Sequence, residues 1–497
     1  MKLAVLLEGL PCRAAPSWLD DIEVLGLEYD SRRVEPGFVF FAFPGSRTSG
    51  ALYARQAVER GAVAVVSELP APAGFPAPWI EVEHGRRALA LASLRFFGHP
   101  DRRLRLAGVT GTNGKTTTVF AVDAMLRHAG RRCGMAGTVV YRIGGRESMA
   151  VNTTPESLDL ARMMDEVARG GDADFVFEVS SHALALERVY GLALHTAVFT
   201  NFTQDHLDFH GTMENYFAAK HRLFEGAGGP PPKFAVINSD DPWSERIATG
   251  GGTERWTYGT GERAAFRVKD IETGFEGVRF AVAHPGGETR IASPLCGRIN
   301  VYNLTAAFAA GVALGLEPEE AAAGLSACRS VPGRFERVDA GQPFLVIVDY
   351  AHTEDALKNL IEAARALEPK RVITVFGCGG DRDKTKRPRM GETAAALSDL
   401  VVATSDNPRS ENPLDILNDI LVGLRKHDTP HIVEPDRRSA IRLAIGRAAA
   451  GDIVLIAGKG HETYQVLAGG TIPFDDRQVA REVLEDFGYG ARGEQVS

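Results

Sequence analysis

The sequence is poor in cysteine, and its cysteines are scattered along the chain. Cys12, Cys133, Cys296, Cys328 and Cys378 form no Cys-x-x-Cys pair. This spacing argues against a disulfide framework and against a cysteine-based zinc site. Reduced thiols are typical of a cytoplasmic protein, and we expect this protein in the cytoplasm.

Long apolar runs and an excess of positive charge are also missing. The apolar run from Leu3 to Leu7 ends at Glu8, and no later run has the length of a membrane span, so we expect neither a signal peptide nor a membrane segment. Lys and Arg number 56 against 64 Asp and Glu, a formal net charge of −8, which argues against a general nucleic-acid or membrane-surface binder.

The length of 497 residues is too great for one ordinary core, although the 44% hydrophobic content is typical of globular proteins. Strand-like and helix-like runs alternate along the chain, which predicts an α/β protein with crossover helices. We expect three domains: a small α/β domain over 1–102, a central phosphate-loop sheet over 103–332, and a Rossmann-like α/β domain over 333–497. Within the central domain we predict one strand over 133–141 and one closing helix over 304–315.

The stretch from Gly108 to Thr118 has the order of a phosphate-binding loop, with a strand-like run before it and a helix-like run after it. Glycines let backbone N–H groups surround phosphate oxygens, and the helix N-terminus adds a positive dipole. Lys115 would reach the terminal phosphates, and the Thr116 hydroxyl would bind magnesium. Val109 replaces one glycine of the strict pattern, and a chance glycine-rich turn is the alternative. The predicted loop residues are Gly111, Thr112, Asn113, Gly114, Lys115, Thr116 and Thr117.

Two side chains at predicted strand ends are candidates for holding a metal ion beside the phosphates. Glu178 ends one apolar strand, and His206 follows another. A carboxylate and an imidazole at neighbouring strand ends would suit magnesium. Asp205 and Asp208 compete for this role, and a solvated capping role for His206 is equally open. Lys220 lies in an amphipathic helical pattern, where an exposed lysine is the plain interpretation.

Four polar loops of the third segment each follow the carboxyl end of a predicted strand. In an open parallel sheet these loops share one edge, where ligands bind, although four unrelated turns remain the alternative. Arginines bind carboxylates and acidic groups accept from ammonium, so the loops suit a small zwitterionic substrate. The loops begin at Asp349, Gly377, Asp406 and Gly458, and the side chains are Arg382, Asp406, Asn407, Arg409 and Glu462. We expect most of the charged run 381–389 to form a solvated surface loop.

Eight motifs, which are spread over essentially the whole chain, together resemble the motifs of one protein family. They are Gly111–Thr117, Glu178–His182, Asp205–His206, Tyr216–Lys220, Asn300–Asn303, Gly333–Glu336, Asp349–His352 and Gly458–Glu462. Together they resemble the Mur ligases of bacterial cell-wall synthesis. Asn152–Pro155, Gly380–Asp383 and Asp406–Arg409 are similar to the branch that adds meso-2,6-diaminopimelate to UDP-N-acetylmuramoyl-L-alanyl-D-glutamate, because lysine-adding members lack the arginine of the last motif.

The resemblance implies ATP and Mg²⁺ as cofactors, a monomer, and N-carboxylation of Lys220. It implies that Thr116, Glu178, His206 and the modified Lys220 organise magnesium. It also implies a catalytic role for Lys115, Glu178, His206 and Lys220. It places ATP also on Asn300, Asn303, Arg334 and Asp349. It places the UDP-sugar dipeptide on Ser31, Ser46, Arg47, Thr48, Asn152, Thr153, Thr154, Ser180 and Arg188, although Leu186 stands where some members have a glutamine. It places diaminopimelate on Arg382, Asp406, Asn407, Pro408, Arg409, Gly458 and Glu462.

Three alternatives stay open at this point. The same ligase chemistry would serve with lysine as the added residue. A folylpolyglutamate-synthase-like ligase shares the phosphate loop and the modified lysine, although the first segment and Asp406–Arg409 argue against it. A nucleotide-gated switch protein would need the phosphate loop, but not the zwitterion-suited residues. From the residues alone, polar turns also remain an alternative for Ser31 and the loop around residues 46–48.

Overall fold

The computed structural model describes residues 1–15, 19–45 and 48–490. The chain divides into two compact units, and each is described by itself. The first unit comprises Met1–Arg267, Ala283–Gly287 and Thr305–Gly324, and the second comprises Val268–Val282, Glu288–Leu304 and Leu325–Ser497. Within the described ranges, no helix is both long and apolar enough to cross a membrane.

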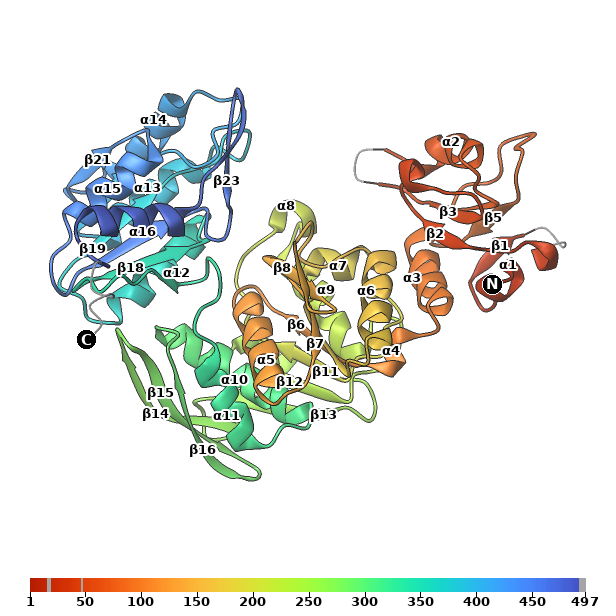
Figure 1. Cartoon of the computed structure of the whole chain (residues 1–497), viewed down its shortest axis with the longest axis horizontal. Coiled ribbons are helices and arrows are strands. Elements are labelled where there is room, and N and C mark those ends of the chain that lie inside the picture. Colours follow the sequence, from red (N-terminus) through yellow and green to blue (C-terminus); the bar gives the residue numbers. More distant parts are fainter. Residues whose placement is uncertain (16–18, 46–47, 491–497) are drawn as a thin grey trace, which may run out of the picture. The chain divides into compact units, whose positions relative to one another are not determined.

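The N-terminal sheet of the first unit has the order β1-β5-β4-β3-β2, with β1 antiparallel and the other neighbours parallel (Figure 1). Strand β3 is buried on both faces, because Val39 and Phe41 belong to one apolar cluster and Phe40 and Ala42 belong to another. The elements are α1 (Leu3–Leu7), β1 (Cys12–Ala14), β2 (Gly26–Glu28), β3 (Phe38–Ala42), α2 (Ala54–Glu59), β4 (Ala64–Ser67), β5 (Trp79–Val82), α3 (Gly85–Phe96) and α4 (Pro100–Arg103).

The central sheet runs in the order β13-β12-β11-β6-β10-β7-β8-β9, and it is parallel from β13 to β7. Because β10 and β11 both flank β6 in parallel, the loops after these three strands share one edge. The elements are β6 (Arg105–Thr110), α5 (Lys115–His128), β7 (Cys133–Ala136), β8 (Val140–Ile143), β9 (Arg146–Met149), α6 (Ser157–Arg169), β10 (Asp174–Glu178), α7 (Ser181–Ala185), β11 (Thr196–Phe199), α8 (Leu207–His210), α9 (Met213–Glu225), β12 (Phe234–Asn238) and β13 (Glu254–Gly259).

Three further strands and two helices follow before the C-terminal sheet. Strand β14 begins beside the end of β13, where Phe266 lies opposite Tyr258. The boundary between the two units falls within these three strands and within both helices. The elements are β14 (Phe266–Gly274), β15 (Gly277–His284), β16 (Gly287–Ser293), α10 (Arg298–Ala313) and α11 (Pro318–Ala327).

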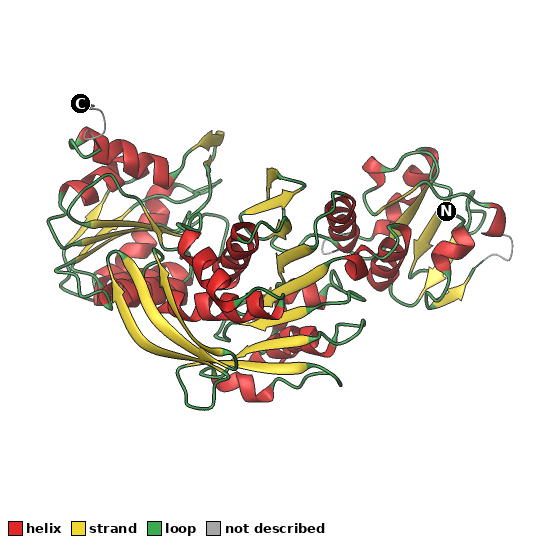
Figure 2. Ribbon diagram, turned by 60° about the horizontal axis from the view of Figure 1, so that its bottom comes forward, coloured by secondary structure: helices red, strands yellow, loops and turns green. Residues whose placement is uncertain are grey.

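The C-terminal sheet has the order β17-β18-β22-β19-β20-β21, and all strands after β17 are parallel. Red helices lie on both sides of its yellow strands in Figure 2. Alternation in the buried strands explains this, since Leu345 and Ile347 of β18 join one apolar cluster and Val346 and Val348 join the other. The elements are β17 (Glu336–Arg337), β18 (Leu345–Asp349), α12 (Glu354–Arg365), β19 (Val372–Phe376), α13 (Lys386–Leu397), β20 (Leu400–Ala403), α14 (Pro413–Leu424), β21 (His431–Val433), α15 (Arg437–Gly446), β22 (Ile453–Ala457), β23 (Tyr464–Leu467), β24 (Gly470–Pro473) and α16 (Asp476–Asp486).

The α/β class and the parallel sheets are confirmed, but several predicted elements are wrong. The single strand over 133–141 is two antiparallel strands, β7 and β8, because the chain turns where Thr138 bonds to Glu178. The helix over 304–315 begins earlier, at Arg298, and α11 follows it. The apolar pattern does not reveal this start, because the first turns of the helix contain the buried polar residues Asn300 and Asn303. The expected bounds of the three domains stay a prediction.

Candidate active site

The predicted phosphate loop joins β6 to α5 in a conformation that demands glycine at two places. Gly111 has φ +145°, and a Cβ there would lie 1.9 Å from the Thr200 hydroxyl. Gly114 has φ +86° and caps the N-terminus of α5. The loop therefore presents a helix N-terminus and closely approached backbone, which are the physical requirements for binding phosphate.

Two lysines converge on one carbonyl of this loop. The Lys115 amine donates to the Gly111 carbonyl at 3.0 Å and to the Thr112 carbonyl at 2.7 Å, and the Lys220 amine donates to the Gly111 carbonyl at 2.7 Å. The interpretation of Lys220 as an exposed helical lysine is wrong, because its side chain is only 2% exposed. Burial, with a contribution from Lys115, lowers the pKa of Lys220 well below its usual value and so favours the uncharged amine.

Glu178 ends β10 as a buried carboxylate held by Thr138, a residue that the sequence did not single out. The Thr138 backbone N–H donates to one carboxylate oxygen at 2.7 Å and its hydroxyl donates to the other at 3.0 Å. Within the described part of the chain, no basic side chain forms an ion pair with this carboxylate. A buried, oriented and uncompensated carboxylate beside a phosphate loop suits a bound cation.

His206 follows β11 and precedes α8 with φ +51°, so the structure places it on the same sheet edge as Glu178. Its imidazole is 45% exposed and lies 3.4 Å from the Asp205 carboxylate. Burial is the main cause that lowers the pKa of His206, and Lys115 and Lys220 add to the effect. No three His, Cys, Asp or Glu side chains of the described residues form a ready metal cluster, so an ion here would need further ligands.

The residues expected to hold the sugar dipeptide gather beside Glu178. The Thr154 hydroxyl donates to the Glu178 carbonyl at 2.8 Å and accepts from the Ser180 N–H at 3.1 Å. Arg188 donates to the Thr154 carbonyl at 2.9 Å and forms an ion pair with Glu156 at 3.0 Å. Two further predicted residues form hydrogen bonds nearby. The Asn152 backbone bonds to the Tyr141 hydroxyl, and the Thr153 hydroxyl bonds to the Thr138 hydroxyl.

After β2 of the N-terminal sheet, the buried Ser31 hydroxyl donates to Gln56 at 2.8 Å, and Ser31 is the first residue of the helical turn that Asp30 caps. The Thr48 carbonyl accepts from the Gly45 N–H at 2.9 Å. Ser46 and Arg47 lie outside the described residues. Ser31 and Thr48 therefore lie after β2 and β3, neighbouring parallel strands, and their proposed contact with the UDP-sugar stays a prediction.

Four residues expected to bind ATP lie in the second unit. Asn300 donates to the Cys296 carbonyl at 2.7 Å, and Asn303 donates to the Asn300 side chain at 3.1 Å. The Asp349 carboxylate accepts from the backbone N–H groups of Phe335 and Ala351. The Arg334 guanidinium lies 5.0 Å from the Tyr350 ring centroid. Their assignment to ATP stays a prediction.

The C-terminal sheet brings most of the predicted amino-acid residues to one edge. Asn407 donates to the Glu462 carboxylate at 2.9 Å. Gly458 has φ +118°, and a Cβ there would lie 2.6 Å from the Asp406 carboxylate. Arg409 donates to the Gly380 carbonyl at 2.7 Å, which joins the loops after β19 and β20. Gly380 packs so closely on the Pro408 carbonyl that a Cβ there would lie 1.9 Å away, whereas Arg382 is exposed.

Three buried cations behind this edge were missed by the sequence analysis. Arg387 forms ion pairs with Glu411 at 2.8 Å and Asp419 at 2.9 Å, so the expectation of a solvated loop is wrong for this residue. Arg437 pairs with Asp476 at 2.6 Å, and both side chains are 0% exposed. The third is Lys459. Nothing local in the sequence marks these residues, because their burial depends on contacts with distant segments.

Three protein-family models match successive parts of this chain. The Mur ligase family, catalytic domain, matches residues 23–97, the Mur ligase middle domain matches 109–311, and the Mur ligase, glutamate ligase domain, matches 333–460. A relative from Solibacter usitatus (strain Ellin6076) is 60% identical over 98% of this chain and 99% of its own length. The chain belongs to the Mur ligase family and is an ATP-dependent ligase.

Particular relatives narrow the comparison. The Solibacter protein is named UDP-N-acetylmuramoyl-L-alanyl-D-glutamate–2,6-diaminopimelate ligase. A solved structure of a ligase with the same name is 33% identical, with a TM-score of 0.69, and the match covers 94% of this chain and 96% of that one. The folylpolyglutamate synthase of Mycobacterium tuberculosis complexed with ADP, at 20% identity and a TM-score of 0.60 over 75% of this chain and 91% of its own, shares the fold.

Proposed function

We propose that the chain adds meso-2,6-diaminopimelate to UDP-N-acetylmuramoyl-L-alanyl-D-glutamate, a step in the synthesis of peptidoglycan precursors. The single observation that carries the choice of amino acid is the position of Arg409. It lies on the sheet edge that also holds Asp406, Asn407, Gly458 and Glu462. An arginine there suits the second carboxylate of diaminopimelate, which lysine lacks.

The reaction needs ATP because hydroxide is a poor leaving group from a carboxylate. Attack of the D-glutamyl carboxylate oxygen on the γ-phosphorus of ATP forms an acyl phosphate and releases ADP. The free amine of diaminopimelate then attacks the acyl carbon, the amide bond forms, and the C–O bond to phosphate breaks as the amine loses a proton. The loop N–H groups, the N-terminus of α5 and Lys115 would stabilise the charge on the transferring phosphoryl group.

Magnesium fits the residues beside the loop. Thr116, Glu178 and His206 would hold it, and the uncompensated Glu178 carboxylate is the observation that supports this assignment. The ion would supply positive charge to the phosphate oxygens when bound.

The buried position of Lys220 also suits carboxylation of its amine. An uncharged amine can attack CO₂, forming an N–C bond and releasing one proton, and burial favours that uncharged form. The resulting carbamate would replace a potential cation with an anion beside the magnesium site. Labelled bicarbonate should give a carbamate carbon signal by NMR that is absent from Lys220→Ala, and equal signals from both proteins would contradict the modification.

The reaction is tested by phosphate release from ATP with magnesium and UDP-N-acetylmuramoyl-L-Ala-D-Glu. Parallel reactions contain meso-diaminopimelate, L-lysine or no amino acid. We expect release with diaminopimelate together with a product heavier by that residue. Release with lysine alone would keep the reaction and overturn the assignment of Arg409. Release without any amino acid would point instead to an uncoupled nucleotide hydrolase.

A further inference from the structure

One buried lysine lies among the proposed amino-acid ligands and has no role so far. Lys459 follows β22, between Gly458 and Gly460, and its side chain is 0% exposed. Its amine donates to the Asn407 side-chain oxygen at 3.2 Å and to the Glu462 carboxylate at 2.9 Å. A buried ammonium must be paired to be tolerated, and this one is paired with two residues of the site.

These contacts fix the orientation of the Asn407 amide. Its oxygen accepts from both Lys459 and the backbone N–H of Val466, at 3.2 and 2.9 Å. Its nitrogen donates to Glu462 at 2.9 Å. Exchanging oxygen and nitrogen would place donor against donor twice and oxygen against a carboxylate, so one orientation is strongly favoured. One N–H of the nitrogen then remains beyond the bond to Glu462, and it is a donor suited to a carboxylate.

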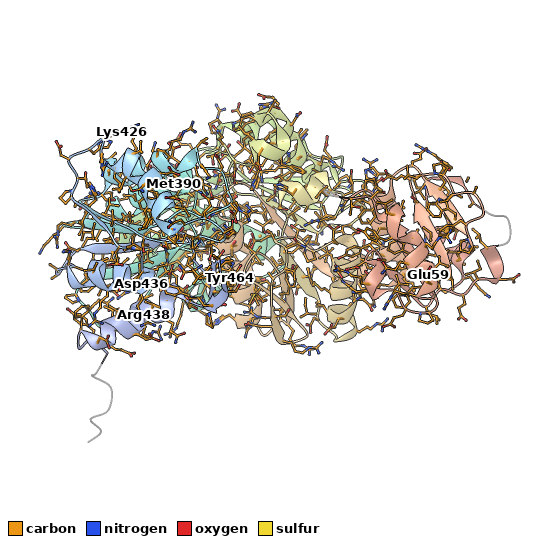
Figure 3. All side chains as sticks on the ribbon, turned by 90° about the horizontal axis from the view of Figure 1, so that it is seen from above. Glu59, Met390, Lys426, Asp436, Arg438 and Tyr464 are labelled. Atoms are coloured by element: carbon orange, nitrogen blue, oxygen red, sulfur yellow. The ribbon has the colours of Figure 1, made fainter. Side chains whose placement is uncertain are left out.

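Strand β23 closes the same network from the other side. Gln465 donates to the Asp406 carbonyl at 2.7 Å, and the Arg409 N–H donates to the Val466 carbonyl at 3.0 Å. Tyr464, labelled in Figure 3, places its ring centroid 5.6 Å from the Lys459 amine. An aromatic ring, an amide and a carboxylate therefore surround the Lys459 amine.

The charge of Lys459 also matters for substrate choice. Asp406 and Glu462 give the edge two carboxylates, and Lys459 supplies a cation against the second. Without that cation, the carboxylates would repel the extra carboxylate of a diamino diacid. A diamino monoacid such as lysine has no carboxylate at that end and would lose less.

We propose that Lys459 is a positioning residue that makes the amino-acid site selective for a diamino diacid over a diamino monoacid. It acts in two ways: together with the Val466 N–H it holds the Asn407 oxygen, so that the amide N–H groups face outward as donors, and it offsets the charge of Glu462. This inference rests on the proposed function, because it takes the edge around Asp406 and Asn407 as the diaminopimelate site.

The test compares the full-length wild type with Lys459→Met, Lys459→Gln and Lys459→Arg. We expect Lys459→Met to raise the KM for diaminopimelate by about 30-fold, since truncating a buried charged partner is costly, while the KM for ATP stays within about twofold. The ratio of kcat/KM for diaminopimelate to that for lysine should fall by about tenfold or more. Lys459→Arg, which keeps the charge, should restore part of that ratio.

Two further measurements separate positioning from general stability. Lys459→Gln keeps a donor but removes the charge, so it should recover discrimination less than Lys459→Arg if charge dominates. The double variant Lys459→Met with Asn407→Ala should cost less than the sum of the two single variants, because the part of the Lys459 effect that acts through Asn407 is already lost in Asn407→Ala. Lys426→Met is the matched control, since that exposed amine pairs with the exposed Glu392 of α13.

The outcomes are distinguishable. A wild type that does not use diaminopimelate overturns the proposed function, and the role of Lys459 falls with it. A wild type that uses diaminopimelate, with variants whose KM values for ATP and diaminopimelate rise equally, overturns the role of Lys459 alone. Fully additive effects in the double variant would overturn the part of the role that acts through Asn407. If Lys459→Met does not fold, the same comparisons with Lys459→Gln decide.

Discussion

The proposed phosphate edge of the first unit and the proposed amino-acid edge of the second unit hold their lysines and arginines in different surroundings. The amines of Lys115 and Lys220 both donate to the Gly111 carbonyl, and burial lowers the pKa of Lys220, which favours its uncharged form. The amino-acid edge instead pairs each buried cation with a carboxylate: Lys459 with Glu462, Arg387 with Glu411, and Arg437 with Asp476.

This difference fits the ligand that is proposed for each edge. Phosphates bring several negative charges, so cations near them serve best when the protein does not neutralise them. A zwitterionic amino acid brings both signs, so its site needs acidic and basic groups held apart in fixed orientations. Ion pairs behind the site supply that rigidity. We therefore expect changes at the first edge to affect chemistry, and changes at the second to affect stability and substrate choice.

The largest effect should come from Lys115→Gln at the phosphate edge. Loss of its charge beside the transferring phosphoryl group should lower kcat about 10³-fold, near 4 kcal/mol, with little change in melting temperature. Phosphate release measures the rate, and Lys233→Gln, an exposed lysine of the same unit, is the control. A kcat within tenfold of wild type would remove Lys115 from the chemistry.

Next in size should be Arg437→Met at the amino-acid edge. The change leaves Asp476 buried without its cation and frees the Ser405 and Ala457 carbonyls, which precede two ligand residues. We expect a loss of about 3 kcal/mol in the free energy of unfolding, measured by denaturant. The neighbouring Arg438→Met breaks only an exposed pair with Glu482 and should cost under about 1 kcal/mol. Equal costs would show that burial of the pair is unimportant.

A smaller effect, confined to one substrate, is expected for Arg409→Ala. The KM for diaminopimelate should rise about 30-fold, near 2 kcal/mol, because its second carboxylate loses a cation, while the KM for ATP should change little. Steady-state kinetics with each substrate varied in turn measures both values. Parallel changes in the two KM values would separate Arg409 from amino-acid recognition.

The smallest effect should be the pH dependence of the Arg387–Glu411 pair. Hydrogen bonds from Arg387, then from the Asp381 N–H, lower the pKa of Glu411 from 4.5 to about 2. A lowered folded pKa means that the stabilisation is fully present above pH 4.5 and is lost as the pH falls toward 2. The difference in unfolding free energy between wild type and Glu411→Gln should shrink over that window. A difference that stays constant would show that the pair does not titrate there.

The sequence by itself determined the features that depend on neighbouring residues or on simple sheet rules. The phosphate loop is recognisable locally, because the glycines, Lys115 and Thr116 stand together between one strand and the next helix. The common edge of the loops starting at Asp349, Gly377, Asp406 and Gly458 also followed, because the carboxyl ends of parallel strands meet at one edge.

The tertiary structure alone decided which charged side chains are buried. Lys220, Arg387, Arg437 and Lys459 look like ordinary surface residues in the sequence, because charged residues are usually exposed. Their partners lie far along the chain: Lys220 meets Gly111, and Arg437 meets Asp476. Glu178 likewise gains its orientation from Thr138, at a turn that the apolar pattern over 133–141 concealed. The physical reason is that burial and pairing are properties of packed segments, whereas local sequence patterns specify only the segments themselves.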